Sequence, residues 1–408
     1  MSALQSYLTT SRRLVPEDEL HAMDPYYQTL YRRVQGEMPG DLPELKVVYS
    51  TERSCEIVEA DDRWYLIYDR YLGETFNLFT RILYHAKVPD YAEAAALKCI
   101  AQRLLSKNKL AEAQNIALLY SLLHPKERLT KNSFGTDRAE LTEMQELFVL
   151  AHEICHHKLK HDPAFMAVHF VNAELIYLEG SEIATRKPSF TERRKLEKEY
   201  GFPVSDRFWK RTYEEGKAHW SRNKSRIIEE ILCDSFALGV MLNARLAQDR
   251  DRFASLCFRA ALLATRYRRI LDYCDALADD IAAGRDLVPV NVLALAMMMR
   301  EQCLRAIFPA AYAKYSAPDW GDENKRFLHM PIGPHQIVGL PSQIVTELNA
   351  ARTKVTDDFS DLVIFRLPGL INSFRKELNV RDVVPMNREL PSDDEIFEMV
   401  ERITAPNI

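Results

Sequence analysis

The sequence predicts an α+β fold that is predominantly helical, with a small β-sheet near the N-terminus and a helical C-terminal region. Glycine is scarce, at 13 of 408 residues, which favours long helices over a loop-rich β fold. Apolar residues make up 47% of the chain, enough for a packed core. Only residues 45–69 read as short strands, whereas most other segments have apolar residues at helical spacing.

The elements are expected in the following order. Residues 1–44 form an N-terminal helical segment. Three short strands follow, at residues 46–49, 55–58 and 64–68. Residues 72–125 form helices, and a longer helix runs from Leu141 to Lys160, with a capping box at Thr142. The remaining predicted helices are at residues 227–238, 251–283, 290–316, 342–355 and 368–378, with a short acidic helix closing the chain.

Length and composition predict three units. Residues 1–44 are the helical segment, residues 45–250 a central domain and residues 251–408 a helical C-terminal domain. The central domain is expected to hold an insertion at residues 186–226, which is rich in basic and aromatic residues. This insertion is interpreted as a solvated lid, and a nucleic-acid-binding patch is the alternative.

The helix from Leu141 to Lys160 carries the motif His152-Glu153-x-x-His156. Two histidines four residues apart project from one face of a helix, so both imidazoles can reach one tetrahedral zinc ion. Glu153 is then placed to act as the general base on a zinc-bound water. Because the motif arises by accident in about one chain in a hundred of this size, a third ligand must support it.

The helix at residues 227–238 offers that third ligand. Glu230 and Asp234 are one turn apart, so Glu230 can bind the metal while Asp234 holds a ligating imidazole by its far nitrogen. The surrounding residues are strongly apolar, and carboxylates there are costly unless a metal or an imidazole pairs with them. The alternative is a pair of acids on the wet face of an amphipathic helix, and Glu229 is interpreted in that way.

These two motifs resemble those of the gluzincin class of zinc metallopeptidases. Residues 150–157 are similar to the soluble ImmA/IrrE-like endopeptidases, and the Glu-x-x-x-Asp-x-Phe-Ala stretch that begins at Glu230 is similar to the HtpX-like and CAAX-processing peptidases. The resemblance implies a zincin-like catalytic domain in which the small sheet lies over the cleft and its edge strand binds an extended substrate. The residue roles that it implies are Zn²⁺ binding by His152, His156 and Glu230, general-base catalysis by Glu153 and support of a histidine by Asp234.

The chain departs from both family patterns at Cys155 and Cys233, where glycine or alanine is usual, and in its long interval between the motifs. Both cysteines are interpreted as small, inert side chains where the two helices cross, with an extra metal ligand or a redox switch as the alternative. None of the seven cysteines has paired spacing, so no disulfide framework is predicted. Without a signal peptide or a membrane-spanning apolar run, the protein is expected in the cytoplasm.

The sequence therefore predicts a zinc-dependent endopeptidase that acts on a specific intracellular protein or peptide. One rival is a helical regulatory or scaffold protein with a structural or vestigial zinc site, which needs a fourth protein ligand from Cys155, Cys233 or His157. The other is a nucleic-acid-associated protein, against which the net charge of −5 argues. The candidates for an oxyanion-stabilising residue are His157, His169, Tyr213 and His219, and the sequence selects none of them. The oligomeric state is not predicted.

Overall fold

The computed structural model describes residues 2–11, 20–38, 40–83, 88–124, 135–162, 216–244, 250–285 and 366–380, with short pieces within 170–178, 190–194, 214, 287 and 300–312. The described part is predominantly helical and carries one small sheet, so the predicted α+β class is confirmed. The helices are α1 (Ala3–Thr10), α2 (Leu20–Glu37), α3 (Arg70–Leu83), α4 (Val88–Ser106), α5 (Leu110–Leu123), α6 (Gly135–His161), α10 (Lys224–Asn243), α11 (Arg250–Ala282) and α15 (Leu367–Val380). The strands are β1 (Glu44–Val48), β2 (Cys55–Ala60) and β3 (Arg63–Asp69).

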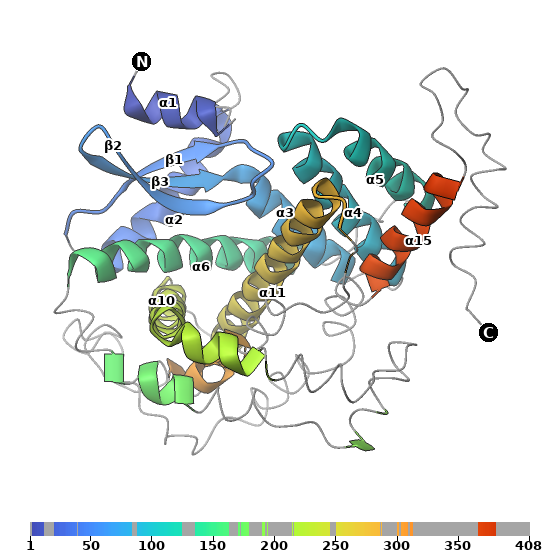
Figure 1. Ribbon diagram of the computed structural model, residues 1–408. Coiled ribbons are helices and arrows are strands. Elements are labelled where there is room, and N and C mark those ends of the chain that lie inside the picture. Colours follow the sequence, from blue (N-terminus) through green and yellow to red (C-terminus); the bar gives the residue numbers. More distant parts are fainter. Residues whose placement is uncertain are drawn as a thin grey trace.

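The three strands form one sheet in the order β1-β3-β2, with β1 parallel and β2 antiparallel to the central strand. The hairpin between β2 and β3 turns at Asp61 and Asp62, whose φ angles of 52° and 58° are those of a tight turn that aspartate tolerates. All three predicted strands are confirmed within two residues of their predicted ends. Figure 1 shows the sheet lying above α6, with β2 on its edge.

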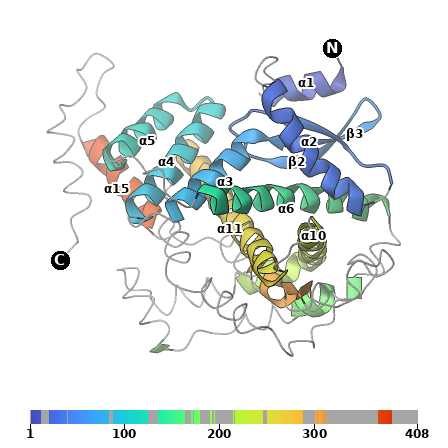
Figure 2. The same cartoon turned by 180° about the vertical axis from the view of Figure 1, so that it is seen from behind.

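Helix α6 is the centre of the molecule. It packs against α2, α3, α10, α11 and the sheet, and the view from behind shows α10 and α11 on the side opposite the sheet (Figure 2). Its residues Leu147, Leu150, Ala151 and Ile154 are fully buried. The helix begins at Gly135, so the predicted capping box at Thr142 is wrong. The helix continues upstream of Thr142, and the Thr142 hydroxyl is buried without a hydrogen-bond partner among the described residues.

A buried carboxylate fixes α6 against its neighbours. Glu146 accepts hydrogen bonds from the hydroxyls of Tyr26 (2.6 Å) and Tyr27 (3.0 Å) on α2 and from Tyr68 (3.1 Å) on β3. Burial raises the pKa of Glu146, and the three hydroxyls act in the opposite direction. Glycine at position 73 is needed beside it, because a Cβ there would lie 1.8 Å from Glu146 Oε1. These contacts fix the rotation of α6 about its axis and its position along that axis, six residues before His152.

Helices α6 and α10 cross closely at Cys155 and Cys233. Both cysteines are fully buried, and their thiols are hydrogen-bonded to each other. Small side chains at these positions let the two helix backbones approach, as expected from the sequence. This close crossing brings the two motif-bearing faces together.

Several predicted segments lie wholly or largely outside the described residues. These are the 186–226 insertion up to its last eleven residues, the helix at 342–355 and the acidic C-terminal helix, while the predicted helix at 290–316 is described only in pieces from residue 300 onward. Helix α11, from the predicted C-terminal domain, packs on α4, α6 and α10 within one shared core. The three-unit division of the chain stays a prediction. A helix apolar and long enough to cross a bilayer does not occur in the described part of the chain.

Candidate metal centre

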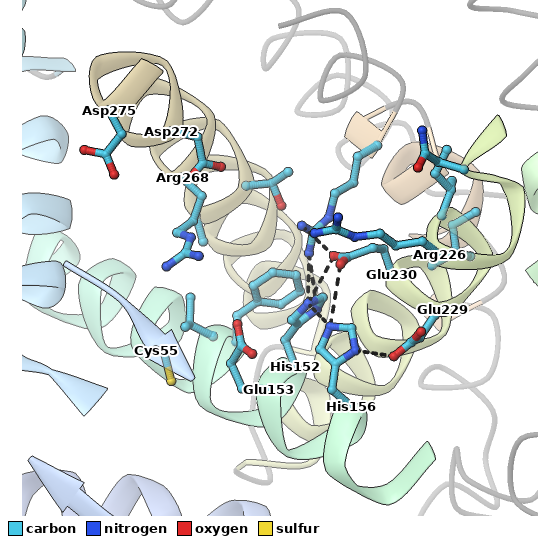
Figure 3. A pocket seen from close by; sticks show the side chains of 18 of the residues that line it. Cys55, His152, Glu153, His156, Arg226, Glu229, Glu230, Arg268, Asp272 and Asp275 are labelled. Atoms are coloured by element: carbon cyan, nitrogen blue, oxygen red, sulfur yellow. Dashed lines mark hydrogen bonds and ion pairs between the residues drawn. The ribbon is translucent and has the colours of Figure 1, made fainter. Parts of the chain in front are cut away.

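The two histidines of the first motif lie on the face of α6 that meets α10. His152 is buried, with 5% of its surface exposed, and His156 is half-buried. Their Nε2 atoms are 3.1 Å apart. Figure 3 shows both imidazoles and the Glu230 carboxylate pointing toward one another between the two helices.

Each imidazole is held from behind by a carboxylate of α10. Asp234 Oδ1 lies 2.9 Å from His152 Nδ1, and Glu229 Oε1 lies 2.8 Å from His156 Nδ1. An ionised carboxylate can only accept a hydrogen bond, so both Nδ1 atoms carry the proton. The two Nε2 atoms then face one another at 3.1 Å, and a proton or a metal ion between them would satisfy both.

Glu229 was interpreted from the sequence as an acid on the wet face of the helix, and the structure adds a contact that this interpretation missed. Its side chain is 39% exposed, yet it orients His156 as Asp234 orients His152. The apolar pattern of α10 could not reveal this role, because it depends on the angle at which α6 crosses α10.

Glu230 completes a set of three converging donors. Its Oε2 lies 3.4 Å from His152 Nε2, and its Oε1 lies 3.7 Å from His156 Nε2. In a tetrahedral zinc site with metal–ligand bonds of about 2.0–2.1 Å, neighbouring donor atoms are separated by about 3.3 Å. The separation of 3.1 Å between the two Nε2 atoms is close to this value, and a different oxygen of Glu230 lies near each of them, at 3.4 and 3.7 Å. The structure thus brings together all four residues predicted to bind or support the metal, and the two Nε2 atoms are spaced as two ligands of one tetrahedral ion would be.

Cys233 is a second candidate for the third ligand. Its sulfur and one nitrogen from each of His152 and His156 all lie within 4.8 Å of one another. The thiol is fully buried, and burial and its hydrogen bond to Cys155 raise its pKa well above the usual range. We favour Glu230, because its oxygens lie 3.4 and 3.7 Å from the two imidazole Nε2 atoms and its lowered pKa keeps it ionised, whereas the raised pKa of Cys233 keeps its thiol protonated.

The charged groups of the centre shift one another's pKa values. Burial tends to raise the pKa of Glu230 and Asp234, but the positive charge of Arg300 and the contacts with His152 together lower both. Burial and Arg300 tend to lower the pKa of His152, but hydrogen bonds to Asp234 and Glu230 raise it to about 9. Without a metal, His152 therefore binds a proton in neutral solution.

Arg300 was missed by the sequence analysis, which assigned no chemistry to the C-terminal half. Its guanidinium contacts Asp234, Glu230 and His152. The sequence signal is a single arginine directly after the apolar stretch at residues 288–299. Such a signal does not say which distant residues the arginine meets.

Two cavities open beside the centre. One, of about 890 Å³, is lined by both histidines, Glu153 and Glu230 together with residues of α11. The other, of about 490 Å³, is lined by Ile57 and Trp64 of the sheet, and shares Glu153, His156 and Glu229 with the first. Cys55 of β2 lines the first cavity and Ile57 of β2 the second, so the edge strand borders both. Glu153 lies beside His152 on the cavity side (Figure 3).

The structure describes two of the four predicted candidates for an oxyanion-stabilising residue, and they line different cavities. His219 lines the larger cavity. His157 lines only the smaller one of these two, and its ring packs at 5.3 Å from Trp64. His169 and Tyr213 lie outside the described residues.

Comparisons with protein families, with curated proteins and with solved structures find no match to this chain. The functional assignment therefore depends on the chemistry and geometry of the centre.

Proposed function

We propose that this protein is a zinc-dependent endopeptidase with a zincin-like catalytic domain, as the gluzincin resemblance implies. The observation that carries the proposal is the convergence of two imidazole Nε2 atoms 3.1 Å apart, each ring held through Nδ1 by a carboxylate. His152, His156 and Glu230 would hold the zinc ion. When bound, zinc supplies Lewis acidity that activates water and polarises the scissile carbonyl.

Residues of the chain would transfer the proton, orient the two imidazoles and bind the substrate. The Glu153 carboxylate accepts the proton of the attacking water and passes it to the leaving amine. Asp234 and Glu229 keep the proton of each imidazole on Nδ1, so that Nε2 stays a donor to the metal. An extended segment of a protein or peptide substrate would lie along β2, whose residues border both cavities beside Glu153.

Zinc content and cleavage test the proposal together. The variants are Glu153→Gln and a matched control, Glu140→Gln, which makes the same change on α6 three turns before the centre. We expect the wild type and both variants to bind one zinc ion per chain. Loss of the general base should slow cleavage by about 10²–10⁴-fold, while Glu140→Gln should cleave as the wild type does.

A search for new N-termini supplies the substrate for this test. Cells expressing the wild type are compared with cells expressing Glu153→Gln, and the termini found only with the wild type identify the cleaved proteins. A wild type without bound zinc, or a Glu153→Gln variant that cleaves at the wild-type rate, would contradict the proposal.

One observation favours a second function. Because Cys233 is within reach of both imidazoles, the centre could bind a metal through His152, His156, Cys233 and Glu230, with no position left for water. The protein would then be a helical regulatory or scaffold protein with a structural zinc site. This alternative predicts bound zinc, no cleavage, and a large loss of zinc affinity in Cys233→Ser.

A further inference from the structure

Arg300 reaches the centre from a part of the chain far from both motifs. Its Nε lies 2.8 Å from Asp234 Oδ2, and its Nη2 lies 2.6 Å from Asp234 Oδ1, so the guanidinium binds this carboxylate with two parallel hydrogen bonds. Its third nitrogen, Nη1, lies 2.9 Å from Glu230 Oε2. One side chain thus holds both the carboxylate that orients His152 and the carboxylate that faces the two imidazoles.

The position of Arg300 leaves the metal-binding direction of His152 open. Arg300 Nη2 is 3.2 Å from His152 Nδ1 and 3.3 Å from His152 Nε2. An atom nearly equidistant from both ring nitrogens cannot lie on the lone-pair axis of either one. Of the two Glu230 oxygens, Arg300 binds Oε2, which faces His152 at 3.4 Å, and leaves Oε1, which faces His156 at 3.7 Å. The guanidinium therefore stands beside the donor atoms and does not replace the ion.

The negative charges of Asp234 and Glu230 explain why a positively charged side chain lies beside them. Asp234 is fully buried, and a buried carboxylate is costly unless it is paired and hydrogen-bonded. His152 supplies only one hydrogen bond to it, and Glu230 adds a second negative charge nearby. The two carboxylates neutralise the charge of Arg300, so the guanidinium repels a metal ion only weakly. Its hydrogen bonds meanwhile hold both carboxylates in place.

We propose that Arg300 is a positioning residue of the metal centre, which fixes Asp234 and Glu230 so that both imidazole Nε2 atoms and one Glu230 oxygen stay available to the metal. The inference rests on the proposed metal site. Arg300 touches the candidate ligands and acts through them.

The test compares Arg300→Gln and Arg300→Lys with a matched control, Arg266→Gln. Arg266 is also buried and paired with an acid, Glu301, at 2.9 Å, and it is neither a candidate ligand nor one of the residues that hold a ligand. Zinc affinity is measured by competition with a chelating indicator. The visible absorption of the cobalt-loaded proteins reports the coordination geometry independently of any activity.

We expect Arg300→Gln to bind zinc at least tenfold more weakly and to lose the intense absorption of tetrahedral cobalt. Arg300→Lys should recover part of the affinity, because it keeps the charge without the two parallel hydrogen bonds. Arg266→Gln should lose stability but keep wild-type zinc affinity and cobalt spectrum. Zinc affinity of Arg300→Gln equal to the wild type would overturn the proposal. Higher affinity would also overturn it, by showing that Arg300 competes with the metal.

A measurement without metal separates this inference from the proposed function. Thermal unfolding is measured on chelator-treated protein. Because Arg300 and Asp234 act as one pair, the unfolding midpoint of the Arg300→Gln/Asp234→Asn double variant should fall no further than that of the less stable single variant. Additive falls would overturn the positioning role. A wild type that binds no zinc would overturn the proposed function, whereas the metal-free comparison would still decide whether Arg300 holds Asp234.

Discussion

Replacing Asp234 with asparagine tests how much of the centre depends on one buried carboxylate. Asp234 Oδ1 accepts hydrogen bonds from His152 Nδ1 and Arg300 Nη2, and Oδ2 accepts one from Arg300 Nε. Asparagine has one acceptor oxygen. If that oxygen takes the place of Oδ1, the amide NH₂ faces Arg300 Nε, and if the amide is reversed, it faces His152 Nδ1–H. Either orientation sets donor against donor in a fully buried place.

The magnitude follows from these contacts. A buried donor left without an acceptor costs about 1–3 kcal/mol, and breaking a buried ion pair costs about 3–5 kcal/mol. Arg300 keeps its contact with Glu230 at 2.9 Å, so the loss should lie at the lower end of that range, about 3 kcal/mol of unfolding free energy. Zinc affinity should fall about 10–100-fold, because His152 is no longer held in the correct tautomer.

Two assays measure these effects. Denaturant unfolding of chelator-treated protein gives the change in stability, and competition with a chelating indicator gives the zinc affinity. Asp62→Asn is the control, because it makes the same change at an exposed turn position outside the centre. If Asp234→Asn matched Asp62→Asn in both stability and zinc affinity, the contacts around Asp234 would support neither the fold nor the metal site.

Three further predictions concern the ligands, the protons and the support of the centre. Cobalt-loaded wild type should lack the near-ultraviolet thiolate-to-cobalt band, and a band that disappears in Cys233→Ser would make Cys233 a ligand. Because the pKa of His152 is raised from 6.5 to about 9, its protonation stabilises the metal-free protein below pH 6.5, and this stabilisation is lost as the pH rises through 9. Zinc must displace this proton, so zinc affinity should increase with pH up to about pH 9 and then level off, and a flat profile would contradict the raised pKa. Gly73→Ala should destabilise the protein by about 1–3 kcal/mol in denaturant unfolding, because the new Cβ would displace Glu146, whereas Gly36→Ala, with no atom near its Cβ, should be neutral or stabilising.

The sequence by itself determined those features that depend on residues close together in the chain. Three short runs within residues 45–69 predicted the strands, and helical spacing placed His152 and His156 on one face of one helix and Glu230 and Asp234 on one face of another. These patterns are local because the periods of strands and helices are fixed by backbone geometry. The same patterns could not fix the start of α6, where a plausible cap lies inside a longer helix.

Only the tertiary structure decided how the two faces meet and what else joins them. The crossing of α6 and α10 at Cys155 and Cys233 sets which acid of α10 faces which imidazole, and so gave Glu229 a role that its exposure alone would not suggest. Arg300 reaches Asp234 across 66 positions of the chain. Such a contact depends on the packing of the whole core, in which no local period relates the two residues.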